Sequence, residues 1–278
     1  MPAPNKEGLL RRSDDGSALP PPDSGDAYAP AVIAERVASA GVAKVALPTL
    51  QTFTLGILAG AFIAFGAMLF TLAITGADLG FGPTRLLGGL AFSLGLILVI
   101  LGGAELFTGN NLIVMAWADG LVSTRALLRN WALVYGGNLL GGIATAVMVH
   151  ASGVLQSGDM AKTAIAIAEA KAALDPGEAF TRAMLCNTLV CLAVWLCNGA
   201  RSATGKILCI IFPISAFVAL GFEHSIANMY FLPIGWLEGA QIGFEAIAFN
   251  LAIVTAGNIV GGSLLVAFVY WIVYRRVG

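Results

Sequence analysis

Two apolar stretches of this chain are too long for a single membrane crossing, and the same polar pattern interrupts both. Residues 86–118 hold about 33 and residues 207–236 about 30 amino acids, whereas about 20 suffice to cross the hydrocarbon core of a bilayer. The shared pattern is Gly-x-Glu-x4-Asn, found at Gly103, Glu105 and Asn110, and again at Gly221, Glu223 and Asn228. Ionisable groups at that depth are costly. The pattern therefore predicts two broken helices with polar groups that serve a function.

The composition assigns the chain to the membrane. Hydrophobic residues make up 58% of the sequence and charged residues only 11%, whereas about a quarter of a soluble domain is charged. The formal net charge of -1 leaves no basic face for a nucleic-acid backbone. We expect the lipid bilayer as a partner and exclude nucleic acid.

Four further stretches have the length of membrane spans, namely residues 53–74, 131–151, 180–197 and 246–274. Together the six predict an all-α membrane protein. Residues 29–45 read as an amphipathic helix lying on the membrane surface. The polar, proline-rich residues 1–28 predict a disordered cytoplasmic tail, and residues 29–278 form the predicted channel domain.

An internal repeat supports this division. The sequence Gly-Asn-x-x-Gly-Gly occurs around Asn138 and again around Asn258, and the distances back to Gly103 and Gly221 differ by only two residues. Each half then holds three spans, and since three is odd, the halves enter the membrane from opposite sides. We expect an aquaporin-like arrangement of two inverted three-helix repeats with the second and fifth helices broken, and a transport site near the midplane.

Lysine and arginine placement predicts the orientation. With a cytoplasmic N-terminus, eleven of these residues fall inside and four outside. We therefore expect both termini in the cytoplasm and the polar linker of residues 152–178 outside.

The breaks favour an anion, because each half-helix that begins there directs unpaired N–H groups toward the pathway. We expect Glu105 and Glu223 to accept bonds from these freed N–H groups; the alternative is a proton-carrying carboxylate pair. Asn138 and Asn258 act either as helix-packing amides or as pore donors. Asn187 lies in the fourth span.

His224 is the histidine within the breaks, and imidazole exchanges a proton near neutral pH. We expect a protonation centre; the alternative is a buried core donor. Thr108 lies at the other break and bonds the histidine, a solute or its own helix carbonyl. Apolar side chains beside the breaks are candidates for constrictions: Phe92, Leu96, Leu106, Phe107 and Phe217.

Three motifs resemble those of the formate/nitrite transporter family. They are Glu-Leu-Phe-Thr-Gly-Asn at 105–110, Asn-Thr-Leu-Val-Cys-Leu-Ala-Val-Trp at 187–195 and Gly-Phe-Glu-His-Ser-Ile-Ala-Asn-Met at 221–229. The resemblance covers about residues 30–276 and implies a homopentamer with a pore in each protomer, which transports small anions such as formate, nitrite or hydrosulfide without an enzymatic step or cofactor.

Carried over by position, the resemblance makes Thr108 and His224 a central pair and places Asn258 near it. Phe92, Leu96 and Phe217 match constriction residues. Lys171 matches a lysine of the outer vestibule that attracts anions, in agreement with its predicted place outside.

We expect a multi-pass channel or transporter of the bacterial inner membrane, with formate as the first substrate and nitrite or hydrosulfide as alternatives. A membrane enzyme would more typically show a metal cluster or nucleophile arrangement, and the sequence offers no histidine or cysteine at ligand spacing. A neutral-solute channel of the aquaporin type would call for Asn-Pro-Ala at the breaks, and neither break contains it.

Overall fold

The computed structural model describes residues 26–276, and this part is helical throughout, with no strand. Residues 1–25, most of the predicted tail, lie outside the described residues. The first half of the chain contains α1 (Pro30–Ala46), α2 (Thr49–Ile74), α3 (Phe81–Gly102), the 3₁₀ turn η1 (Gly109–Ile113), α4 (Val114–Ala118) and α5 (Thr124–Ala151). The second half contains η2 (Val154–Gln156), α6 (Met160–Ala172), α7 (Pro176–Gly199), α8 (Ala203–Ala219), α9 (Ser225–Glu238), α10 (Phe244–Ile259), the π-helical η3 (Val260–Phe268) and α11 (Val269–Tyr274).

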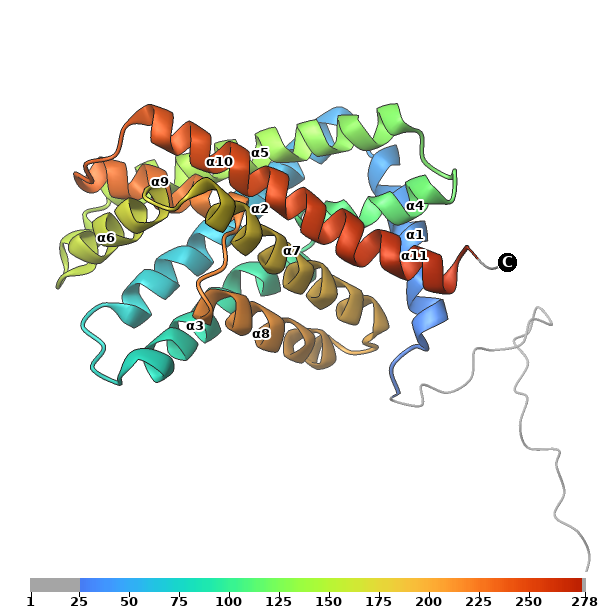
Figure 1. Cartoon of the computed structure of the whole chain (residues 1–278), viewed down its shortest axis with the longest axis horizontal. Helices are drawn as coiled ribbons and strands as arrows, with labels where there is room; N and C mark the ends of the chain where they lie inside the picture. Colours follow the sequence, from blue (N-terminus) through green and yellow to red (C-terminus); the bar gives the residue numbers. More distant parts are fainter. Residues whose placement is uncertain (1–25, 277–278) are drawn as a thin grey trace, which may run out of the picture.

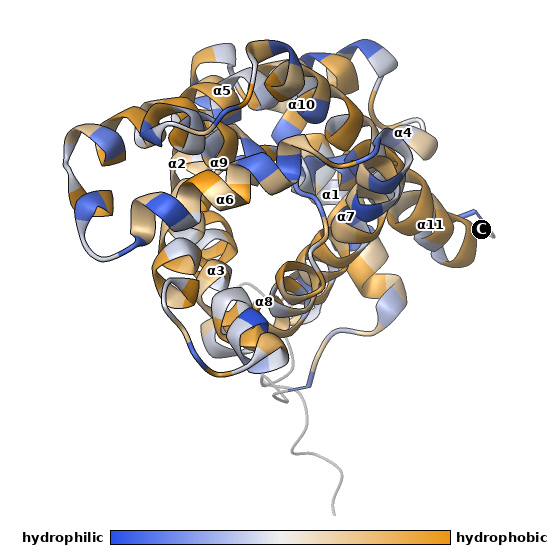
Figure 2. Cartoon of the chain, turned by 60° about the vertical axis from the view of Figure 1, so that its left-hand side comes forward, coloured by the Kyte–Doolittle hydropathy of each residue, from blue (hydrophilic) through white to orange (hydrophobic). Residues whose placement is uncertain are grey.

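Five of the described helices are long and apolar enough to cross a membrane: α2, α3, α5, α7 and the continuous helix Phe244–Tyr274. Helix α8 is equally apolar but has only 17 residues, and α9 follows it with 14. The long helices pack side by side, with α6 and α1 at opposite ends of the bundle (Figure 1). Apolar residues predominate along these helices, as Figure 2 shows.

Both predicted breaks are confirmed. Helix α3 ends at Gly102, and the chain becomes helical again only at Gly109. Helix α8 ends at Ala219, and α9 begins at Ser225. Gly103 and Gly221 turn the chain with φ values of +78° and +74°. Such positive φ angles are open to glycine at no steric cost, which explains the glycine at the start of each motif.

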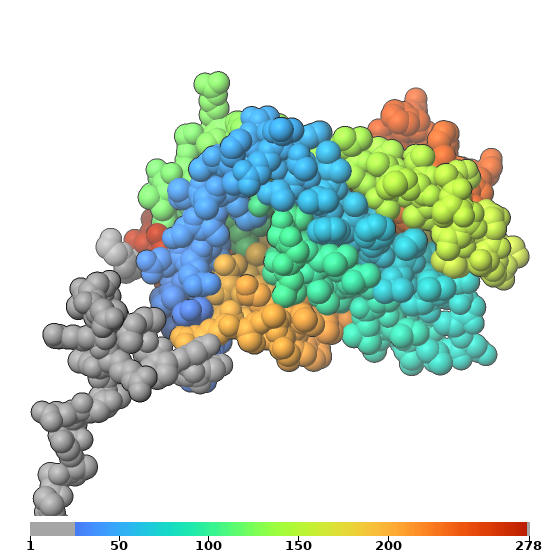
Figure 3. All heavy atoms as spheres, turned by 180° about the vertical axis from the view of Figure 1, so that it is seen from behind, coloured from blue at the N-terminus to red at the C-terminus, as the bar shows by residue number. Residues whose placement is uncertain are grey.

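Close backbone contact between α2 and α5 holds the first half together. A Cβ atom added at Gly60 would lie 2.2 Å from the carbonyl oxygen of Asn138, and one at Gly141 would lie 2.1 Å from that of Ile57. Helices in lipid associate through such packing, because burial of apolar surface alone gives no advantage there. Figure 3 shows the face on which α1 and α2 lie beside α3 and α8.

Two predictions for the ends of the bundle need correction. The linker of residues 152–178 contains the helix α6, whose Ala168 packs so closely on α9 that a Cβ atom at Gly235 would lie 2.3 Å from it. Helix α1 forms as predicted, but Ile33 and Val37 are buried in a cluster with residues of η1, α4 and α7. Protein therefore covers the apolar face that we assigned to the membrane surface.

The contact between α2 and α5 predicts that Gly141→Ala destabilises the protein. The added methyl group overlaps the backbone of Ile57, and overpacking should lower the apparent melting temperature in detergent by about 5 °C or more. The matched control is Gly136→Ala on the same helix, where the new Cβ atom would meet only Phe53 Cε2 at 3.7 Å. Equal melting temperatures for the two variants would contradict the packing described here.

Candidate functional site

Two cavities enter the bundle from opposite ends. The first, which we name the α6 vestibule, has a volume of about 340 Å³, and its lining includes Arg85, Lys171, Arg182, Phe217 and His224. The second, the α1 vestibule, has a volume of about 320 Å³, and its lining includes Lys44, Leu96, Glu105, Leu106 and Lys206. No described residue lines both. Each vestibule thus contains cationic side chains and ends at one of the helix breaks.

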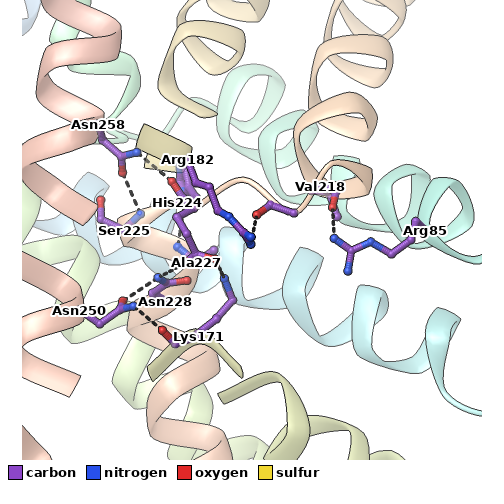
Figure 4. Close-up of polar contacts among 12 residues, drawn as sticks. Arg85, Lys171, Arg182, Val218, His224, Ser225, Ala227, Asn228, Asn250 and Asn258 are labelled. Carbon is purple, nitrogen blue, oxygen red and sulfur yellow. Dashed lines mark hydrogen bonds and ion pairs between the residues drawn. The ribbon is translucent and has the colours of Figure 1, made fainter. Parts of the chain in front are cut away.

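A network of four side chains lies where the α6 vestibule meets the break. Lys171 Nζ donates to Glu223 Oε1 at 2.8 Å, and the amide of Asn228 donates to Glu223 Oε2 at 2.7 Å. The same amide nitrogen donates to Asn250 Oδ1 at 2.8 Å, and Asn250 donates to the carbonyl oxygen of Lys171 at 2.9 Å. The network ties α6, α9 and α10 to the loop at the break, as Figure 4 shows for its labelled members.

The other vestibule repeats this network. Lys44 Nζ donates to Glu105 Oε1 at 2.6 Å, and the amide of Asn110 donates to Glu105 Oε2 at 2.6 Å and to Asn130 Oδ1 at 2.9 Å. Asn130 donates to the carbonyl oxygen of Lys44 at 3.4 Å. The prediction that the two glutamates accept bonds from freed backbone N–H groups is wrong. Lysine and asparagine side chains bind both carboxylates instead.

Two buried asparagines satisfy the freed backbone groups. Asn138 accepts a bond from the Phe107 N–H at 2.9 Å and donates to the carbonyl oxygens of Glu105 and Gly56 at 2.9 and 2.8 Å. Asn258 likewise accepts from the Ser225 N–H at 2.8 Å. It donates to the carbonyl oxygens of Glu223 and Ala183, at 2.9 and 2.8 Å. Neither asparagine lines a vestibule. They hold the breaks in shape rather than supplying donors to a pore.

The two breaks meet at His224 and Thr108, since His224 Nε2 lies 2.9 Å from Thr108 Oγ1. His224 Nδ1 accepts a bond from the N–H of Ala227 at 3.1 Å and so caps the first turn of α9. An imidazole nitrogen that accepts a bond carries no proton. We therefore assign the proton of the neutral ring to Nε2, which donates to Thr108.

Asn187, on α7, touches the first break and the last span together. Its Nδ2 atom lies 2.8 Å from Asn111 Oδ1 and 2.7 Å from the carbonyl oxygen of Asn258. These contacts agree with the supporting role expected for it.

Four of the five predicted constriction residues line a vestibule. The Phe92 and Phe217 rings meet edge to face with centroids 5.7 Å apart, and the Phe217 ring stacks on His224 at 5.9 Å. Leu96 and Leu106 line the other vestibule. Phe107 lines neither vestibule and packs against the α5 rings Trp131 and Tyr135 at 5.8 and 5.1 Å. We remove Phe107 from the constriction.

Sequence reasoning missed several residues of the site: Lys44, Asn130, Asn250, Phe231, Arg85 and Arg182. The repeat contained a signal for two of them. Asn130 follows Asn110 by 20 residues and Asn250 follows Asn228 by 22, the same two-residue difference as between the glycine and asparagine motifs. Extending the alignment of the halves in the other direction would have paired Lys44 with Lys171.

The model of the formate/nitrite transporter family matches residues 31–272. The chain belongs to this family. The formate channel FocA of Escherichia coli strain K12 is 38% identical to it over 273 residues, which cover 90% of this chain and 96% of the relative. The uncharacterized transporter YrhG of Bacillus subtilis strain 168 is 40% identical over 250 residues, covering 89% and 94% of the two chains.

Solved structures agree with this assignment. A pentameric formate channel with formate bound has a TM-score of 0.76 and 40% identity, over 82% of this chain and 98% of that chain. An ion channel of the same family has a TM-score of 0.81 and 28% identity, over 87% and 98%. The apolar helices and the family make this chain a multi-pass membrane protein of a channel and transporter family, not of an enzyme family.

The geometry of Asn258 predicts that Asn258→Leu destabilises the second break. The substitution leaves the Ser225 N–H and two carbonyl oxygens buried without these partners, and each such group costs about 1–3 kcal/mol. We expect a lower melting temperature of the purified protein and loss of its assembled form in detergent. The control is Asn198→Leu, because the Asn198 amide bonds only the carbonyl of Val194 in its own helix. A melting temperature equal to that of the control would contradict the capping role.

Proposed function

We propose that this protein passes small monovalent anions, formate first, through a pore in each protomer of a homopentamer. One observation carries the proposal: a buried histidine and threonine meet between two vestibules, and each vestibule carries cations. Membership of the formate/nitrite transporter family supports it. Nitrite and hydrosulfide are the alternatives within the same function.

We also propose six membrane crossings arranged as two inverted repeats. In this arrangement α8 and α9 together make the fifth crossing, and α3 with η1 and α4 makes the second. The matched networks at Glu105 and Glu223 support the repeat, and they extend it to the preceding helices α1 and α6. The pentamer follows the assembly of the related formate channel.

The orientation we propose places both termini in the cytoplasm of a bacterium and the protein in its plasma membrane. The excess of lysine and arginine on that side supports this orientation. The two ends of the described chain also lie at the same end of the bundle, where α1 contacts α11 (Figure 1). The channel domain then comprises residues 29–278, preceded by the tail.

The anion enters a vestibule, where Lys171 or Lys44 offsets the loss of its hydration, and then meets a narrow apolar section. Phe92 and Phe217 border this section on one side and Leu96 on the other. Burying an uncompensated charge there is costly. A proton donor between the vestibules removes this cost, because a neutral acid crosses apolar surroundings more easily than its anion.

His224 supplies this proton in our proposal. The ring takes up a proton at Nδ1 when the bond from Ala227 opens, and the Nε2 proton then passes to the anion in place of Thr108. The ring returns to neutrality and the anion leaves as a neutral acid, so one proton moves with each anion. Transport should therefore become faster as the pH on the entry side falls.

Reconstituted protein should carry formate and nitrite into liposomes at rates well above those of empty liposomes, and glycerol at the background rate. Small oxyanions fit the cationic vestibules, whereas a neutral polyol has no countercharge there. Uptake of labelled formate and light-scattering assays of glycerol entry provide the measurement. Glycerol or water entry without any anion uptake would refute the proposed function.

His224→Asn should abolish formate uptake or remove its dependence on pH. Asparagine can still cap the Ala227 N–H, so the fold should survive while the exchangeable proton is lost. Uptake is measured from about pH 5 to pH 8, the range in which histidine changes charge. His150→Asn is the matched control, because His150 pairs with Glu238 at 2.8 Å away from the breaks. An unchanged rate and pH profile in His224→Asn would make this histidine structural.

A further inference from the structure

Two arginines of the α6 vestibule converge on the second helix break. Arg85 comes from α3 and Arg182 from α7, and both are partly buried in the vestibule lining. A Cβ atom added at Gly221 would lie 2.7 Å from Arg85 Nη2 and 3.8 Å from Arg182 Nη1. The glycine at the break therefore leaves room for the guanidinium groups, which Figure 4 shows approaching from different helices.

Both arginines bind the carbonyl end of the broken helix α8. Arg85 donates from Nε to the carbonyl oxygen of Ala219 at 3.0 Å and from Nη2 to that of Val218 at 3.2 Å. Arg182 Nη1 donates to the carbonyl oxygen of Gly221 at 3.4 Å. The last carbonyls of a helix lack partners within it and carry partial negative charge. Without these cations, that end of α8 would repel an anion in the vestibule.

The balance of charge singles out Arg85. Lys171 is paired with Glu223 at 2.8 Å, and Arg182 is paired with Glu178. In the described part of the chain, Arg85 has no carboxylate partner; it bonds carbonyl oxygens and lies 6.0 Å from the ring of Phe81. The vestibule therefore gains its surplus positive charge from Arg85. A guanidinium group has five N–H donors, and only two of its nitrogens are engaged by α8.

The first break has no matching arrangement. A Cβ atom at Gly103, the counterpart of Gly221, would meet nothing within 4 Å. The cations of the α1 vestibule are Lys44, which pairs with Glu105 at 2.6 Å, and Lys206. The arginine pair is therefore a feature of one end of the pathway and departs from the repeat.

We propose that Arg85, assisted by Arg182, is an anion-recruiting site that binds a planar monovalent oxyanion such as formate before it reaches Lys171. The fork of N–H donors on a guanidinium group matches the two oxygens of a carboxylate, which a lysine ammonium does not. The inference rests on the proposed function and adds the residue that captures the substrate at one mouth. Lys171, already held by Glu223, then acts on an anion that Arg85 has recruited.

The test measures initial formate uptake by proteoliposomes against formate concentration, at two ionic strengths set with sodium gluconate. Arg85→Gln should raise the KM about five-fold with a maximal rate within about two-fold of the unmodified protein, and should weaken the loss of uptake at high salt. Arg85→Lys keeps the charge and should raise the KM less. Lys162→Gln is the matched control, because this exposed lysine of α6 lies outside the vestibule lining; it should change neither quantity.

An unchanged KM and salt dependence in folded Arg85→Gln would overturn the inference, and so would an equal defect in Arg85→Lys and Arg85→Gln, which would point to a role in binding α8 alone. If Arg85→Gln does not fold, Arg182→Gln decides the matter, since it leaves the bonds from Arg85 in place. A KM raised about two-fold there supports the pair, and an unchanged KM overturns it. Unmodified protein that carries no formate would instead refute the proposed function.

Discussion

A helix that breaks inside a membrane frees backbone groups that lipid cannot satisfy, and this structure depends on how they are satisfied. Asn138 and Asn258 each accept from one N–H and donate to two carbonyls at a break. Because these amides satisfy the backbone, the glutamates at the breaks remain available to pair with lysines. The bonds that hold the breaks in place also bring His224 and Thr108 within hydrogen-bonding distance.

Charge is handled differently at the two ends. Each glutamate has one lysine and one asparagine, so the two networks are nearly neutral and serve to fix the loops. The α6 vestibule adds Arg85 and Arg182 at the carbonyl end of α8, while the α1 vestibule adds Lys206. The fold is repeated, but the electrostatic surroundings of a solute differ along the path. Such asymmetry gives the two mouths different abilities to concentrate anions.

The sequence predicts most of this fold because the repeat fixes the breaks: Gly103 and Gly221 need positive φ angles, and apolar length locates the spans. The pairing of His224 with Thr108 was also expected. Hydrogen-bond partners within the site were not, because Glu105 meets Lys44 only through the tertiary fold. Neither the orientation of Phe107 toward α5 nor the convergence of Arg85 on Gly221 has a local sequence pattern. The helix α6 was missed because its polar residues resemble those of a loop.

The central claim is that His224 moves a proton together with each anion. Its most direct test is the ratio of protons to formate ions taken up by proteoliposomes, measured with an internal pH dye and labelled formate while valinomycin and potassium hold the membrane potential. The account predicts equal numbers of protons and formate ions, and uptake that does not respond to the imposed potential. Formate uptake that follows the potential without acidifying the interior would contradict it.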